Sequence, residues 1–287
     1  MEKRRRHDGS FFLAMLPLYV TTLVFVLLPV LYVVALSFMK RDATWGVTSE
    51  FTLENYIRLW DPIYLKVLLD SLKIAVKTTL LALAIGYPFA YCMAKLPPRK
   101  RGIVMVLVIV PFWTNALVRI YGWMILLRAN GVVNTLLLEI GIVDVPLKLL
   151  YTDGAVLLGM VYSLLPFMIL PSYTSIEKMD WSLVEAARDL GAGKMRAFLT
   201  VTLRLTLPGI LSGCVLVFVP SMGLFFISDL LGGGKEVLMG NLIQNQILTA
   251  RNWPFGAALS VVMMLMTLLF LFVYRKSTKQ SQPEGMA

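Results

Sequence analysis

The amino-acid sequence predicts an all-α, polytopic membrane protein with six transmembrane helices. Hydrophobic residues make up 58% of the 287 residues, charged residues only 15%, and the mean hydropathy is +0.75. Soluble domains contain roughly 45–50% apolar and about 25% charged residues. A chain this apolar must expose its surplus to lipid, so we expect one membrane domain rather than several soluble ones.

Six apolar segments approach or exceed the length of about 20 residues that a helix needs to cross a bilayer. The first follows a basic stretch, but its apolar run from Phe11 to Phe38 is far longer than the core of about 7–15 residues in a secretory signal. We expect it to remain as a helix that Pro17 and Pro29 bend without ending. The predicted spans are 11–38, 70–95, 102–127, 152–174, 207–231 and 254–274.

The basic residues between these spans predict the orientation. Sixteen Lys and Arg residues lie in the connections on one side, and eight lie on the other. Because Lys and Arg concentrate in cytoplasmic loops, both termini are expected in the cytoplasm. The net charge of +10 therefore indicates topology, and its placement at span ends argues against nucleic-acid binding. The predicted parts are a tail, first helix and outer loop (1–66), a core of five helices (67–275) and a cytoplasmic tail (276–287).

Two outer segments and one pair of glycines carry smaller predictions. Residues 51–60, FTLENYIRLW, mix aromatic and charged side chains, which favours a short helix along the membrane surface. Residues 131–143 are apolar but too short to span, so a re-entrant or surface helix is expected. Gly209 and Gly213 form a GxxxG pattern, which is typical of close helix packing.

The cytoplasmic segment 175–206 is charged yet has the pattern of two helices. Ser182 followed by Glu185 is typical of a capping box that opens a helix reaching Leu190. Gly191 and Gly193 are expected to end that helix, because glycine accepts the left-handed backbone of a helix end. A second helix is predicted over 194–205. Such a protruding charged pair has no surface of its own chain to cover, so it should dock on a partner.

This segment resembles a known family. Glu185, Ala186, Ala187 and Gly191 match the EAAxxxG coupling-loop motif of binding-protein-dependent ABC importer permeases, although Arg204 stands where that motif has a proline. The resemblance covers nearly the whole chain. Stretches such as PFWTNALVRIYGWMILL, at 111–127, are similar to the first of the two permease subunits of spermidine/putrescine importers. It implies the type I ABC importer permease fold with a coupling loop over 175–206.

The resemblance also implies partners and a location. These are a second homologous permease, two copies of a cytoplasmic ATPase and a periplasmic polyamine-binding protein, assembled in the bacterial inner membrane. The chain itself is expected to be no enzyme and to bind no cofactor, with ATP and Mg held by the ATPase. Its two GK sequences depart from the phosphate-loop pattern GxxxxGK[ST], for example at Met195 and Glu236. His7, Cys92 and Cys214 lie far apart, so no metal site is expected.

A polyamine is an alkyl chain with ammonium groups, and carboxylates and aromatic faces complement it. Asp229, Trp113 and Tyr121 are therefore the candidate pathway residues. Asp229 is predicted to lie on one helical stripe with Ser221 and Phe225, and its alternative role is a structural ion pair. For the two aromatic rings, the alternative to a pathway role is ordinary packing against lipid or other helices. The structural in-membrane polar residues are Asn115 and Arg119. Arg119 would repel a polyamine, so it is expected to pair with a carboxylate or with helix-end carbonyls.

Other functions remain open from the sequence alone. An importer permease for another solute, such as an iron complex, thiamine or an anion, would share the coupling loop. A non-transporting scaffold subunit would share the spans. A membrane enzyme is disfavoured, because no cluster of His, Cys or carboxylate residues supports one.

Overall fold

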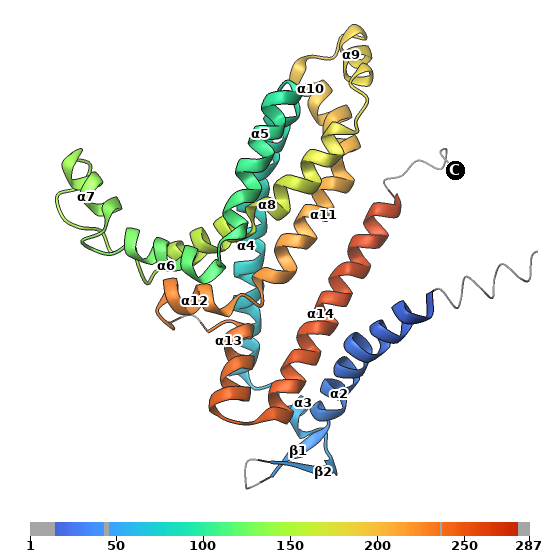
Figure 1. Cartoon of the computed structure of the whole chain (residues 1–287), viewed down its shortest axis with the longest axis vertical. Helices are drawn as coiled ribbons and strands as arrows, with labels where there is room; N and C mark the ends of the chain where they lie inside the picture. The colour runs from blue at the N-terminus through green and yellow to red at the C-terminus, as the bar shows by residue number, and fades with distance from the viewer. Residues whose placement is uncertain (1–14, 43–45, 236, 281–287) are drawn as a thin grey trace, which may run out of the picture. The chain divides into compact units, whose positions relative to one another are not determined.

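The computed structural model describes residues 15–42, 46–235 and 237–280, and most of them are helical (Figure 1). One two-stranded antiparallel hairpin is the exception to the predicted all-α class. The elements in chain order are η1 Leu23–Leu27, α2 Leu28–Ser37, β1 Met39–Arg41, β2 Val47–Phe51, α3 Glu54–Arg58, α4 Pro62–Ala94, α5 Pro98–Ile109, η2 Val110–Trp113, α6 Ala116–Leu126, α7 Val132–Glu139, α8 Asp153–Glu177, α9 Ser182–Asp189, α10 Lys194–Ala197, η3 Phe198–Thr202, α11 Leu203–Ser221, α12 Phe225–Gly232, α13 Met239–Gln244, η4 Asn245–Thr249 and α14 Trp253–Gln280.

Four of the described helices are long and apolar enough to cross a membrane, and a bent pair makes a fifth if it is one span. The remaining predicted span, 70–95, corresponds to the later part of α4, which is 33 residues long and ends at Ala94. Charged side chains occupy the first half of α4 at Lys66, Asp70, Lys73 and Lys77, and they lower its apolarity. A crossing by α4, and with it the total of six, stays a prediction.

The first predicted span is confirmed as one helix over Met15–Ser37. Its residues 11–14 lie outside the described part. The helix continues through Pro17 and Pro29, as expected. A π-helical turn, η1, directly precedes Pro29, whose nitrogen has no hydrogen to donate to the helical ladder.

The third predicted span, 102–127, is wrong as a single straight helix. The segment Pro98–Trp113, made of α5 and η2, meets α6 at an angle of 93°. Pro111 lies in η2, and the side chain of Asn115 caps a new helix by accepting a hydrogen bond from the Leu117 amide at 2.8 Å. The segments on both sides of Thr114 and Asn115 are apolar, so the hydropathy of the whole stretch did not reveal the bend.

The fifth predicted span, 207–231, is wrong at both ends. One continuous helix, made of α10, η3 and α11, runs over Lys194–Ser221. The second coupling helix and the fifth span are therefore the same helix. It ends after Pro220, and α12 begins only at Phe225. Ser221 and Phe225 lie on different helices, so the predicted stripe connecting them to Asp229 is wrong as well.

The chain divides into two compact units. The first comprises residues 1–64 and 242–265 and includes α2, the hairpin and the start of α14. The rings of Phe38 and Phe51 stack with their centroids 5.1 Å apart, and the Asn55 amide donates to the Ser37 and Met39 carbonyls at 3.0 and 2.9 Å. The predicted surface helix at 51–60 is shorter than expected: α3 is a helix over Glu54–Arg58 only.

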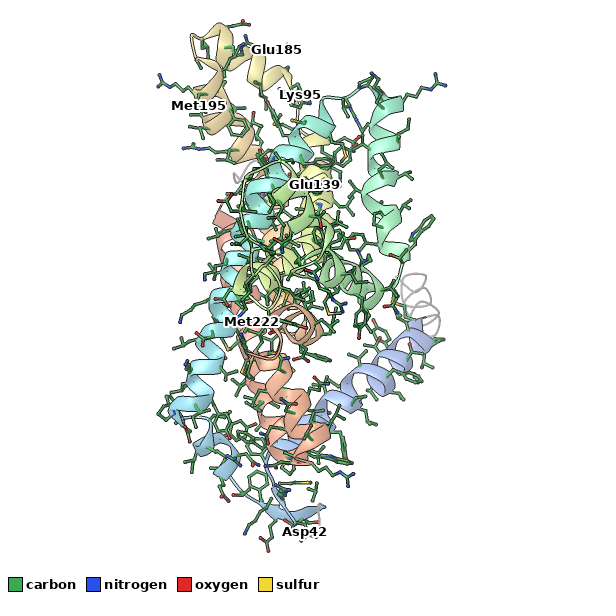
Figure 2. All side chains as sticks on the ribbon, turned by 90° about the vertical axis from the view of Figure 1, so that its left-hand side faces the viewer. Asp42, Lys95, Glu139, Glu185, Met195 and Met222 are labelled. Atoms are coloured by element: carbon green, nitrogen blue, oxygen red, sulfur yellow. The ribbon has the colours of Figure 1, made fainter. Side chains whose placement is uncertain are left out.

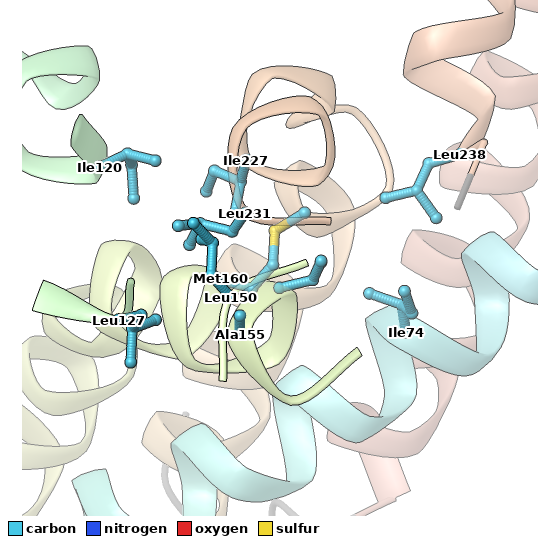
Figure 3. Packing of buried hydrophobic residues seen from close by; sticks show 10 residues of the cluster. Ile74, Ile120, Leu127, Leu150, Ala155, Met160, Ile227, Leu231 and Leu238 are labelled. Carbon is cyan, nitrogen blue, oxygen red and sulfur yellow. The ribbon is translucent and has the colours of Figure 1, made fainter. Parts of the chain in front are cut away.

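The second unit comprises residues 65–241 and 266–287. One of its apolar clusters joins α4, α6, α8 and α12 through side chains such as Ile74, Ile120, Met160 and Ile227 (Figure 3). Elsewhere α11 packs along α8, and the predicted close approach at the GxxxG pattern is confirmed. A Cβ added to Gly209 would lie 2.6 Å from the Pro171 carbonyl oxygen, so only glycine fits there.

Candidate functional site

The first candidate site is the exposed surface of α9, facing away from the helix bundle, together with the turn that follows it. In the second unit, α9 lies at the end of the α8–α11 pair away from α12 (Figure 1), where Figure 2 shows Glu185 and Met195. Leu190 is 89% exposed and Met195 70% exposed. The side chain of Glu185 has no recorded hydrogen bond or ion pair within the described residues. Exposed apolar side chains beside an unpartnered carboxylate are typical of a docking surface.

The turn after α9 has the geometry that the glycines predicted. Gly191 has a φ of +87°, in the left-handed region. The Gly191 amide donates to the Arg188 carbonyl at 2.9 Å, and the Ala192 amide donates to the Ala187 carbonyl at 3.0 Å. These two bonds are a Schellman motif, which satisfies the last carbonyls of the helix. Beside the turn lies a groove of about 550 Å³, lined by Glu185, Arg188, Asp189, Gly191, Ala192, Gly193 and Lys194.

The predicted capping box is wrong. The Ser182 side chain does not cap α9; instead Oδ1 of Asp180 accepts a hydrogen bond from the Ser182 amide at 3.0 Å. The backbone and side-chain hydrogen bonds from Ser182 hold the pKa of Asp180 below its usual value. Asp180 and Ser182 are both good capping residues, so the sequence pattern alone could not choose between them. Glu185 is thereby left without a capping role.

The sequence did not predict the aromatic contacts that hold α9 to the helix bundle. Tyr91 of α4, Trp181 before α9 and Phe198 of η3 form an aromatic group, with Tyr91–Trp181 and Tyr91–Phe198 centroids 6.0 and 5.5 Å apart. The Lys95 Nζ lies 4.2 Å from the Tyr91 ring centroid. No spacing in the sequence predicts this group, because its three rings come from segments remote from one another; each segment only contains an aromatic residue.

A second missed contact fixes the same end of the bundle. The Arg101 guanidinium donates to Glu177 Oε1 at 2.7 Å, and the Tyr173 hydroxyl donates to the same oxygen at 2.6 Å. Arg101 also donates to the Ala94 carbonyl at 3.0 Å. These contacts tie α4, α5 and α8 together. The sequence does place opposite charges, Arg101 and Glu177, at the ends of two predicted spans, which is compatible with an ion pair between them.

The second candidate site lies around two breaks in the helices. The helices that follow these breaks, α6 after the bend at Trp113 and α12 after the end of the long helix at Ser221, pack together, with Ile120 in the same cluster as Ile227 and Leu231 (Figure 3). Irregular backbone at membrane depth is tolerated only where protein buries it or where it lines a water-filled cavity, and transporters use such breaks at binding sites. The predicted pathway residues lie around these two breaks.

Trp113 and Tyr121 lie on either side of the first break. Trp113 ends η2 and is 82% exposed, and Tyr121 lies on α6 and is 47% exposed. No ring or hydrogen-bond contact is recorded for either side chain within the described residues. Both rings are therefore open to a ligand, a partner or lipid.

Asp229 is exposed on α12, where its Oδ1 accepts a hydrogen bond from the Asn241 amide at 2.6 Å. Arg119 is placed differently from expectation. Among the described residues it forms no salt bridge with Asp229 or any other carboxylate. Its Cζ lies 4.4 Å from the ring centroid of Phe112 and 5.6 Å from that of Tyr162. The structure thus does not bring the two ionisable groups into a pair.

Comparison with known proteins gives three kinds of similarity: to a family, to individual relatives and to a solved structure. Residues 82–280 match the family described as binding-protein-dependent transport system inner membrane component. The chain is 50% identical to the spermidine/putrescine transport system permease protein PotB of Escherichia coli (strain K12), covering 89% of this chain and 93% of that protein. It is 48% identical to the PotB of Haemophilus influenzae, covering 89% of each.

The third similarity is to a solved structure, that of a bacterial ABC transporter involved in the import of the acidic polysaccharide alginate. The TM-score is 0.75 at 16% sequence identity, covering 96% of this chain and 98% of that chain. At this identity the likeness shows a shared fold and nothing about the transported solute.

Proposed function

Because the chain belongs to the family of binding-protein-dependent transport system inner membrane components, we propose that it is a transmembrane permease subunit of an ATP-driven importer of polyamines. The inner-membrane location and the permease role follow from the family, and the fold is that of ABC importer permeases, as the sequence predicted. The polyamine assignment is carried by one observation, the 50% identity to PotB over 89% of the chain. The alginate importer shares only the fold, so it does not argue for an anionic solute.

We assign the coupling step to the exposed surface of α9 that faces away from the helix bundle. Glu185, Ala186, Ala187 and Gly191 would dock on the cytoplasmic ATPase, and closure of two ATPase copies would move the spans between inward-facing and outward-facing states. The exposed Leu190 and the free Glu185 carboxylate support this role. ATP and Mg would be held by the ATPase, because this sequence lacks the phosphate-loop pattern.

The remaining partners complete the importer. A second homologous permease would supply the other half of the pathway, and a periplasmic polyamine-binding protein would deliver the substrate. Both termini of this chain would lie in the cytoplasm. Along the pathway, Asp229 would attract the ammonium groups, and Trp113 and Tyr121 would offer aromatic faces, while Asn115 would hold the bend that begins α6.

The test is uptake by the complete complex. The chain, its second permease, the ATPase and the binding protein are reconstituted in liposomes, and entry of labelled spermidine is measured with and without competing putrescine. We expect ATP-dependent uptake that putrescine reduces. The purified chain alone serves as the control and should hydrolyse no ATP. ATP-dependent uptake of another solute class, with no uptake of either polyamine, would refute the assignment.

A further inference from the structure

Among the described residues, Arg119 contacts aromatic rings and no carboxylate. Its guanidinium carbon lies 4.4 Å from the Phe112 ring centroid and 5.6 Å from that of Tyr162. Its Nε and Nη1 atoms are buried, and neither has a hydrogen-bond partner among the described residues. A buried donor without an acceptor is costly, so this arrangement needs a reason.

The two rings belong to a larger aromatic group drawn from three elements. Phe112 of η2 lies edge-on to Phe167 of α8, with centroids 6.1 Å apart. Tyr162 of α8 lies edge-on to Trp123 of α6, with centroids 5.5 Å apart. All four rings are only partly buried within this chain or are exposed. The group borders the bend between η2 and α6, where the backbone of the third span is interrupted.

Such a group favours organic cations as a class. The negative face of an aromatic ring attracts guanidinium and ammonium groups alike, and the attraction is larger where water is excluded. A polyamine ammonium would thus compete with Arg119 for the same faces. Two cations cannot share them, because like charges at contact distance repel each other strongly in a medium of low dielectric constant.

We propose that Phe112 and Tyr162 form a binding subsite for an ammonium group of the transported polyamine, and that Arg119 occupies this subsite in the substrate-free conformation. This inference rests on the proposed function. Arriving substrate displaces the guanidinium, whose buried and unpartnered nitrogens gain water or other acceptors on leaving. Arg119 is then an internal competitor that keeps the empty subsite filled.

The experiment measures binding of labelled spermidine to the purified complex of permeases and ATPase, without the binding protein. Arg119→Gln removes the competing charge and should lower the Kd for spermidine by about 2- to 30-fold, the range of a single cation–π contact. Arg119→Lys keeps a cation and should bind as the unmodified complex does. Adding Phe112→Leu to Arg119→Gln should abolish the gain.

Phe167→Leu is the matched control. It removes a ring of the same aromatic group that has no recorded contact with Arg119, so combined with Arg119→Gln it should leave the gain intact. An unchanged Kd in Arg119→Gln, or a gain that survives Phe112→Leu, would overturn the proposal. So would failure of the Arg119→Gln complex to assemble when Arg119→Lys assembles, because the guanidinium would then serve the structure. If the unmodified complex imports no polyamine in liposomes, the proposed function fails; if it does import polyamine, these outcomes concern the subsite alone.

Discussion

At the scale of single residues, Asp229 is the carboxylate among the proposed pathway residues. Asp229 is exposed on α12, and its Oδ1 accepts a hydrogen bond from the Asn241 side-chain amide at 2.6 Å. A carboxylate that is oriented by an amide and exposed is suited to bind a cation. The alternative role, a counter-ion for Arg119, finds no support in the described residues, because Arg119 contacts aromatic rings instead.

Asp229→Asn should therefore reduce transport without impairing assembly. The substitution keeps the shape and removes the charge, and the loss of one charge-assisted contact costs about 1.5–3 kcal/mol, or roughly ten- to a hundredfold in transport efficiency. Spermidine uptake and complex yield are measured side by side. Asp144→Asn, at an exposed carboxylate of the loop between α7 and α8, is the control and should transport normally. Unimpaired transport by a folded Asp229→Asn complex would remove this residue from the pathway.

At the scale of elements, the proposed coupling surface includes the turn between α9 and the long helix Lys194–Ser221. Two glycines border this turn, and they differ in what their backbones require. Gly191 has a φ of +87°, whereas Gly193 has a φ of −63° that any residue adopts. Neither has a neighbour within 4 Å of the position that a Cβ would take. A side chain at Gly191 therefore acts through backbone strain alone.

Gly191→Ala should weaken coupling, while Gly193→Ala should not. The left-handed backbone costs a residue with a Cβ roughly 1–2 kcal/mol, which lowers the population of the intact turn by about five- to thirtyfold where the alternatives are close in energy. The measured quantity is the uptake of spermidine per ATP hydrolysed in the reconstituted complex. Equal ratios for both variants would show that ATPase docking does not depend on this turn.

The same elements show which structural features could be predicted from the sequence. Gly191 was predictable because a left-handed helix end depends on one residue type at one position. The bend at Asn115 and the gap before Phe225 were not found from hydropathy, because the flanking segments are apolar and hydropathy does not report the direction of a helix. The pairing of Tyr87 with Thr206, whose oxygens lie 2.9 Å apart, joins residues remote in sequence. The contact of Arg119 with the Tyr162 ring of α8 is likewise between segments remote in sequence.

At the scale of the whole molecule, the charged stripe of α4 bears on the number of crossings. Lys66, Asp70, Lys73 and Lys77 recur at helical spacing along this 33-residue helix. Lys73 and Asp70 form a salt bridge of 2.9 Å, and both line a hollow of about 300 Å³ together with Asp153 at the start of α8. Such a stripe is incompatible with lipid contact at membrane depth, so this face must border water or protein if α4 crosses.

If α4 crosses the membrane, the segments before and after it lie on opposite sides. The topology can be tested by labelling single cysteines in an otherwise cysteine-free chain. An impermeant maleimide added from outside should label Ser49→Cys before α4 and Asp144→Cys in the outer loop. Arg99→Cys after α4 and Arg188→Cys in α9 should react only once the membrane is permeabilised, because basic loops remain in the cytoplasm. All four positions are exposed in the structure, so a missing signal reflects the side of the membrane and not burial. Labelling of Ser49→Cys and Arg99→Cys from the same side would mean that α4 does not cross. If the bent pair of α5 and α6 is one span, the crossings would then number five and the two termini would lie on opposite faces.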